Sequence, residues 1–127
     1  FDGEVVTIGD FAGRPLVINL FASWCAPCVS EMPAIERVKE DVGDEVAFLG
    51  IAVNDRVEDA QALIEETGIT WTVARDPHGE LTAALEPVGM PTTYLVSPDG
   101  EIVEQHTGAL DEDQLRDLLR EHFGIDS

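Results

Sequence analysis

The sequence predicts an α/β fold in which a central mixed β-sheet is flanked by helices on both faces. Two nearly continuous apolar runs, 15–22 and 46–53, each precede a helical pattern, as is typical of parallel strands covered on both faces. Two later strands, 92–96 and 101–107, are separated by the tight turn 98–100 and therefore form an antiparallel hairpin. The parallel neighbours require right-handed crossovers, so helices must lie between them.

The elements of the first half follow from proline and glycine punctuation. Residues 5–8 form a short extended run that turn signals follow. The first helix should cover 26–42, because Pro27 suits a first helical turn, where its missing N–H costs nothing. Pro33 falls inside this helix and is expected to kink it.

The elements of the second half follow from caps and short runs. Asp55 precedes Glu58 by three residues, which resembles a capping box, and the helix that starts there should stop at Gly68. The remaining elements are a short strand, a short helix and a C-terminal helix, at 71–74, at 80–85 and after the cap Asp111.

Composition bounds the function. The 127 residues predict one domain, 1–127, with enough apolar residues (44%) for a core. The net charge of −19 disfavours nucleic-acid binding and anionic membrane surfaces, which both need a basic face. The acidic residues are spread along the chain, which favours a soluble monomer. No apolar run is long enough to span a membrane.

The two cysteines carry the chemistry. Cys25 and Cys28 follow the first buried strand and open the first helix. A thiol at a helix N-terminus meets unpaired N–H groups and the positive end of the helix dipole, and both favour the reactive thiolate. A second thiol three residues later can close a ring with the first. The pattern therefore predicts disulfide exchange.

Two other interpretations of a Cys-x-x-Cys pair are weaker. A structural disulfide across so short a loop would add little stability. A zinc site needs four ligands at short spacings, and the chain has no third cysteine. The other possible zinc ligands are histidines, and these are scattered along the chain at His78, His106 and His122. We therefore expect no metal.

The chain resembles thioredoxin-fold proteins in three features. These are Trp24-Cys25-Ala26-Pro27-Cys28 after a buried strand, the internal Pro33, and the segment 89–93 (Gly-Met-Pro-Thr-Thr) before a later strand. The resemblance implies a thioredoxin-like three-layer fold in which Pro91 is cis and lies against the cysteine pair. It also implies that the backbone of Met90 is open to pair with a substrate strand.

A closer resemblance, over nearly the whole chain, is to the TlpA/ResA/DsbE (redoxin) family. Cys28 and Pro91 are 63 positions apart, which leaves room for a central strand–helix insertion at about 54–76. The N-terminal extension, 1–14, fits the family's hairpin, and Glu31 lies three residues after the second cysteine, as in this family.

The resemblance implies where such a protein works and what it does. Members are typically extracytoplasmic, in the periplasm or cell envelope, often with a membrane tether, and commonly reduce disulfides during cytochrome c maturation. The chain begins at Phe1 without an initiator methionine, so we expect a domain excised from a longer protein, with a tether outside this sequence. Expected partners are proteins with thiols or disulfides and an upstream redox partner.

Four residues receive expected roles. Cys25 should attack the partner, and Cys28 should be the buried resolving thiol. Plain thioredoxins carry a buried aspartate where this chain has Asn19, which cannot titrate and should instead satisfy backbone groups in the sheet. Glu31 is then the nearest candidate for proton handling. The alternative is an exposed glutamate that simply favours the helix N-terminus.

The rest of the expected site binds substrate and needs no cofactor beyond the redox-active disulfide. Neither residue between the cysteines donates a side-chain hydrogen bond to the first thiol, which favours a moderate or reducing potential. The expected substrate-binding residues are Trp24, Ala26, Pro27, Met90, Pro91 and Thr92.

Three alternatives to a reductant stay open. One is a disulfide-forming oxidase of the same family. A second is a thiol peroxidase, although no Pro-x-x-x-Thr-x-x-Cys pattern precedes Cys25. A third is a Cu(I) chaperone with His106 as third ligand, although such sites space their cysteines by three residues rather than two. The sequence leaves the direction of electron flow undecided.

Overall fold

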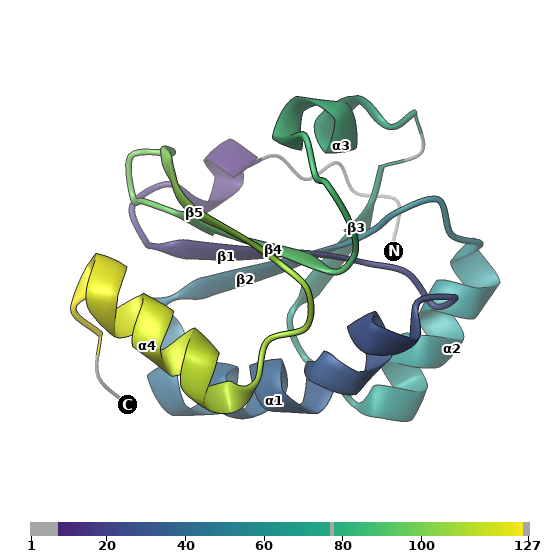
Figure 1. Cartoon of the computed structure of the whole chain (residues 1–127), viewed down its shortest axis with the longest axis horizontal. Coiled ribbons are helices and arrows are strands. Elements are labelled where there is room, and N and C mark those ends of the chain that lie inside the picture. Colours follow the sequence, from purple (N-terminus) through teal and green to yellow (C-terminus); the bar gives the residue numbers. More distant parts are fainter. Residues whose placement is uncertain (1–7, 77, 126–127) are drawn as a thin grey trace.

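The computed structural model describes residues 8–76 and 78–125, which form one five-stranded sheet and the helices packed on it. Figure 1 shows the arrangement. In chain order the elements are η1 (Ile8–Phe11), β1 (Leu16–Phe21), α1 (Ala26–Val42), η2 (Gly43–Glu45), β2 (Ala47–Ala52), α2 (Val57–Thr67), β3 (Thr72–Arg75), α3 (Glu80–Leu85), β4 (Thr92–Val96), β5 (Ile102–Thr107) and α4 (Glu112–Phe123).

The sheet is mixed, as the sequence predicts. Its strand order is β3-β2-β1-β4-β5, so β1 lies at the centre. β1 pairs in parallel with β2, and β2 in parallel with β3. β4 is antiparallel to β1 and to β5. The central position of β1 buries every one of its residues and brings its carboxyl end to the middle of one sheet edge.

The two faces of the sheet are covered unequally (Figure 1). One face packs against α1, α2 and α4, and its core includes Val17 and Phe21 of β1 with Leu115 of α4. Among the described residues, the opposite face carries α3 and η1 alone, and its core includes Ile18 with Leu85 of α3. Alternate residues of β1 thus serve different cores, and the odd-numbered ones face the long helices.

The helix caps mostly follow the predictions. Cys25 is the N-cap of α1, which continues through Pro33 to Val42. Asp111 caps α4 in a reciprocal capping box with Gln114: the Gln114 N–H donates to Asp111 Oδ1 (2.8 Å), and the Asp111 N–H donates to Gln114 Oε1 (2.9 Å). These caps fix the positions at which α1 and α4 begin.

Two local predictions are wrong. Asp55 does not cap α2, which begins at Val57 with Arg56 as N-cap and no side-chain cap, because the Asp55 carboxylate is bonded to Ser23 instead. Ile8, expected to end an extended run at 5–8, instead starts the 3-10 helix η1. The rest of that run, and most of the predicted N-terminal hairpin, fall outside the described residues.

The domain boundaries stay predictions. The segment 54–76, predicted to be an insertion, contains α2 and β3. Across the described residues, no helix has the length and apolar character needed to cross a bilayer.

Candidate active site

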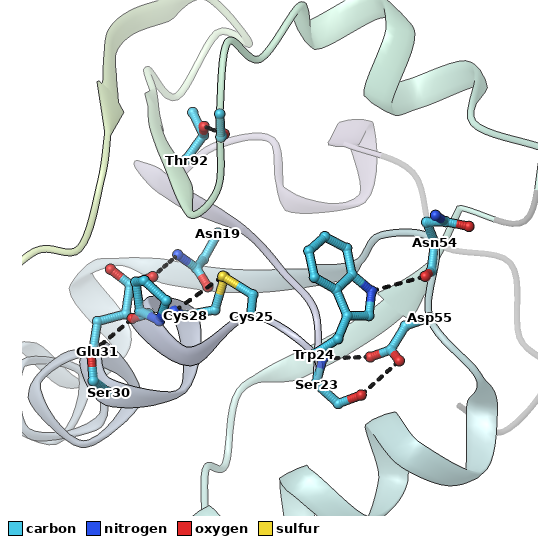
Figure 2. Close-up of a disulfide and its surroundings, with 12 residues drawn as sticks. Asn19, Ser23, Trp24, Cys25, Cys28, Ser30, Glu31, Asn54, Asp55 and Thr92 are labelled. Atoms are coloured by element: carbon cyan, nitrogen blue, oxygen red, sulfur yellow. Dashed lines mark hydrogen bonds between the residues drawn. A yellow bond between two sulfur atoms is a disulfide. The ribbon is translucent and has the colours of Figure 1, made fainter.

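The two cysteines lie at the carboxyl end of β1 and form a disulfide (Figure 2). After β1 the chain turns, and the Cys25 N–H donates to the Ala22 carbonyl (3.2 Å). Cys25 Sγ accepts the N–H of Cys28 at 3.3 Å, within the first turn of α1. Cys25 is 7% exposed and Cys28 is fully buried, so a partner can reach only the first sulfur.

The loop before the disulfide is tied to the loop after β2. The N–H and the hydroxyl of Ser23 each donate to the Asp55 carboxylate at 2.7 Å. The indole N–H of Trp24 donates to the carbonyl of Asn54 (3.0 Å), and 60% of the Trp24 surface stays exposed. Figure 2 shows these contacts on the side of the disulfide away from Glu31. The loop is therefore held by two fixed anchors while the indole faces solvent.

The loop before β4 contains the cis peptide bond predicted from the resemblance, between Met90 and Pro91. Pro91 is buried and its carbonyl accepts the N–H of Gly108 (2.8 Å). Thr92 is fully buried, and its hydroxyl donates to the carbonyl of Gly89. A partner cannot reach the Thr92 side chain in this arrangement, and the substrate contact expected at Thr92 stays a prediction. Its hydroxyl closes the loop from inside.

The residues expected to form an apolar rim around Cys25 differ in exposure. Trp24, Ala26 and Pro27 are exposed, and Met90 is half-buried. The structure adds Val88, which is 84% exposed in the loop that leads to the cis bond. An apolar residue between two turn-forming segments was the available signal for it, but nothing in the sequence shows that the loop lies at the surface.

Glu31 lies one helical turn after Cys28 and is 2% exposed. Its Oε1 accepts from Asn19 Nδ2 (2.7 Å), and its Oε2 accepts the backbone N–H of Leu110 (2.9 Å). Burial raises the pKa of this carboxyl from 4.5 to about 7, and the two hydrogen bonds only partly oppose that rise. The exposed alternative for Glu31 is thus wrong.

Asn19 does not satisfy backbone groups, contrary to expectation. Its Nδ2 donates to two side chains, to Glu31 and to Thr93 Oγ1 (3.1 Å). β1 and β4 pair Asn19 with Thr93 directly, so both side chains point to the face that α1 covers. Sequence spacing could not reveal this contact, because it depends on the register between two strands far apart in the chain.

Histidine placement bears on the copper alternative. Over 8–76 and 78–125, no three His, Cys, Asp or Glu side chains gather as metal ligands would. His106 lies on β5, in register with Thr93 of β4.

Comparisons with known proteins agree with this geometry. The family model described as Redoxin matches residues 1–119. The chain is 32% identical to the thiol-disulfide oxidoreductase ResA of Oceanobacillus iheyensis over 123 residues, which are 94% of this chain and 63% of that protein. The chain thus spans less than two thirds of this relative's length.

Two solved structures share the fold. The thioredoxin domain of a thiol-disulfide oxidoreductase from Bacteroides vulgatus is 26% identical, with a TM-score of 0.81 over 94% of this chain and 86% of that one. A secreted Mycobacterium tuberculosis disulfide oxidoreductase homologous to Escherichia coli DsbE is 26% identical, with a TM-score of 0.74 over 84% of this chain and 81% of that one. The chain therefore belongs to the Redoxin family and is related to thiol-disulfide oxidoreductases of the ResA and DsbE type.

Proposed function

We propose that this chain is the catalytic domain of a protein thiol-disulfide oxidoreductase that reduces disulfides of extracytoplasmic proteins, as in cytochrome c maturation. The observation that carries the proposal is a disulfide at the start of α1 whose first sulfur borders exposed apolar side chains and whose second sulfur is buried. A purely structural bridge would need neither the rim nor a buried acid beside it.

The reduced protein would attack through Cys25. Its thiolate would be stabilised by the Cys28 N–H that now reaches Cys25 Sγ. Attack on a partner disulfide breaks the partner's S–S bond, forms a mixed disulfide and releases one partner thiolate. Cys28 then loses its proton and attacks Cys25 Sγ, which releases the second partner thiolate. Two electrons pass to the partner, and this protein ends as the disulfide seen here.

Glu31 would take the proton that Cys28 gives up. It lies one turn further along α1 on the same buried side, and its pKa of about 7 lets it exchange protons near neutral pH. Asn19 stands where plain thioredoxins carry a buried aspartate and cannot take a proton. The buried carboxyl of Glu31 would therefore accept the proton of Cys28.

The partner would dock on the apolar rim. The exposed side chains of Trp24, Ala26 and Pro27 offer a surface beside Cys25, and the Met90 backbone would pair with an extended partner segment. Val88, which is exposed two residues before Met90, would be a further apolar contact for such a segment.

The setting follows from the relatives and stays part of the proposal. One related structure is of a secreted protein, which supports an extracytoplasmic location. A reductant there needs an upstream donor of thiols, because each turnover leaves the disulfide. That donor and the substrate are both proteins in this proposal.

The reduction potential of the Cys25–Cys28 couple tests the direction. We expect a potential of about −230 mV or lower after equilibration with glutathione at pH 7, in the range between glutaredoxin and thioredoxin. A potential above about −150 mV, towards that of DsbA, would instead support the disulfide-forming oxidase.

A further inference from the structure

The buried carboxyl of Glu31 has hydrogen-bond partners that suit only its ionised form. Both of its oxygens accept, one from Asn19 Nδ2 (2.7 Å) and one from the Leu110 N–H (2.9 Å). Asn19 is 2% exposed, and within the described residues its Oδ1 is buried and accepts no hydrogen bond. A buried carbonyl oxygen without a donor is unfavourable, so its retention here calls for an explanation.

Protonation of Glu31 would change what its neighbours must offer. The Leu110 N–H belongs to the backbone and can only donate, so Oε2 must stay an acceptor. The proton must then lie on Oε1, which at present faces the Asn19 amide nitrogen, another donor. Donor would face donor in a site that lacks contact with solvent.

An amide can resolve this conflict by turning over. Rotation about the Cβ–Cγ bond exchanges Nδ2 and Oδ1, which are nearly equal in size, and the unpaired oxygen then faces the acid proton. Thr93 tolerates both states, because its hydroxyl accepts from Nδ2 now and would donate to Oδ1 afterwards. In Figure 2 the Asn19 amide and the Glu31 carboxyl point toward one another beside the disulfide.

We propose that Asn19 is a positioning residue that turns its side-chain amide when Glu31 gains or loses a proton, so that one buried carboxyl is hydrogen-bonded in both states. The proposal rests on the proton role given to Glu31 above. It explains why an amide suits this position, since leucine offers no partner and aspartate would add a second acid.

Other titratable groups surround the pair and must be separated from it. On α1 these are Cys25 and Cys28, which do not titrate as a disulfide. Before α4, Asp111 is exposed, and its carboxylate accepts the N–H of Gln114 as the helix cap. On β5, His106 is half-buried and in register with Thr93. His106→Gln therefore serves as the control that removes the imidazole in register with Thr93.

Nuclear magnetic resonance of the oxidised protein tests the proposal directly. The Nδ2 protons of Asn19 should show contacts with Glu31 and Thr93 side chains at pH 8 and lose them at pH 5. The midpoint should equal that of the Glu31 carboxyl carbon and should persist in His106→Gln. Glu31→Gln mimics the protonated acid, because its amide also pairs one acceptor with one donor, and should hold the turned amide at every pH.

Asn19→Leu separates a turning amide from a fixed donor. If Asn19 bonds Glu31 in both its ionised and its protonated state, Asn19→Leu should move the midpoint of the Glu31 titration by less than one pH unit. The variant should also slow disulfide exchange about tenfold at pH values below and above that midpoint. A fixed donor stabilises only the carboxylate, so its loss would raise the midpoint by more than one unit, which would overturn the proposal. Should this variant not fold, the amide resonances of the wild-type chain still decide.

The two proposals fail in different ways. Amide contacts that stay constant from pH 5 to 8 while the Glu31 carbon titrates would refute the turning amide and leave the proton role intact. An amide that turns, together with an exchange pH profile unchanged by Glu31→Gln, would refute the proton role and leave the amide coupling standing.

Discussion

The contact between α1 and α4 holds two glutamates in opposite environments. On its buried side, Glu31 accepts hydrogen bonds from two uncharged donors, and burial raises its pKa to about 7. On its exposed side, Glu112 accepts from the guanidinium of Arg116 (3.1 Å) and pairs with that of Arg37 (3.2 Å). These hydrogen bonds, with Arg116 the larger, lower the pKa of Glu112.

The difference shows what decides the behaviour of a carboxyl. Each glutamate has both oxygens engaged, so the number of partners does not separate them. The charge of the donors and the access of water do. Glu31 is left near the pH at which it can exchange a proton, whereas Glu112 stays ionised and joins two helices.

Replacement of either cysteine beside Glu31 should have the largest effect on disulfide exchange. Cys25→Ser should abolish exchange with a protein disulfide, because the accessible nucleophile is gone. Cys28→Ser should still attack but accumulate the mixed disulfide, visible as a covalent adduct by mass spectrometry. An adduct on Cys28 in the Cys25→Ser protein would reverse the assigned roles.

Glu31→Gln should slow exchange by about 100-fold near pH 7 and remove the inflection of the rate near that pH. Stopped-flow measurement of the rate from pH 5 to 9 checks this. An unchanged pH profile would return Glu31 to a structural role.

The same variant should change how stability depends on pH. Since folding raises the Glu31 pKa from 4.5 to about 7, the folded state binds more protons than the unfolded state between these values. Its stability therefore falls as the pH rises, by about 3 kcal/mol at most. Glu31→Gln lacks this loss, so urea unfolding should show the variant gaining on the wild type from pH 4.5 to 8. Parallel stability curves would contradict the raised pKa.

Glu112→Gln should give the opposite sign and a smaller effect. A lowered pKa adds stability above the ordinary pKa and loses it as the pH falls through the folded value. The variant should thus be less stable than the wild type at pH 7, and the difference should disappear as the pH falls through the lowered pKa of Glu112. At 1 M NaCl the difference should shrink, since this pair is partly exposed. A difference that persists at low pH would point to packing instead.

Much of this fold could be predicted because its signals are local. The apolar run of β1, the prolines of α1 and the cap of α4 each act within a few residues. The cysteine pair and its place at the carboxyl end of a central strand could be predicted for the same reason, together with the glutamate one turn later.

The contacts that give those residues their properties are not local. Asn19 meets Thr93 across 74 positions, and Glu31 meets Leu110 across 79. Asp55 has the spacing of a cap but lies beside Ser23 once β1 and β2 pair, and the nearby hydroxyl and N–H take its carboxylate. Local pattern predicts which residues are polar, and strand register decides which of them meet.

A third carboxylate, that of Asp117, should contribute least to the free energy of unfolding. Asp117 pairs with Arg120 one turn away on α4 (3.1 Å), and both side chains are more than half exposed. Water screens such a pair, and holding two exposed side chains in one geometry costs conformational entropy. Asp117→Asn should therefore change the free energy of unfolding by less than about 0.5 kcal/mol. Urea unfolding at 0.05 and 1 M NaCl checks this beside Glu112→Gln. A loss as large as that of Glu112→Gln would mean that ion pairing alone, without the bridge between two helices, stabilises this surface.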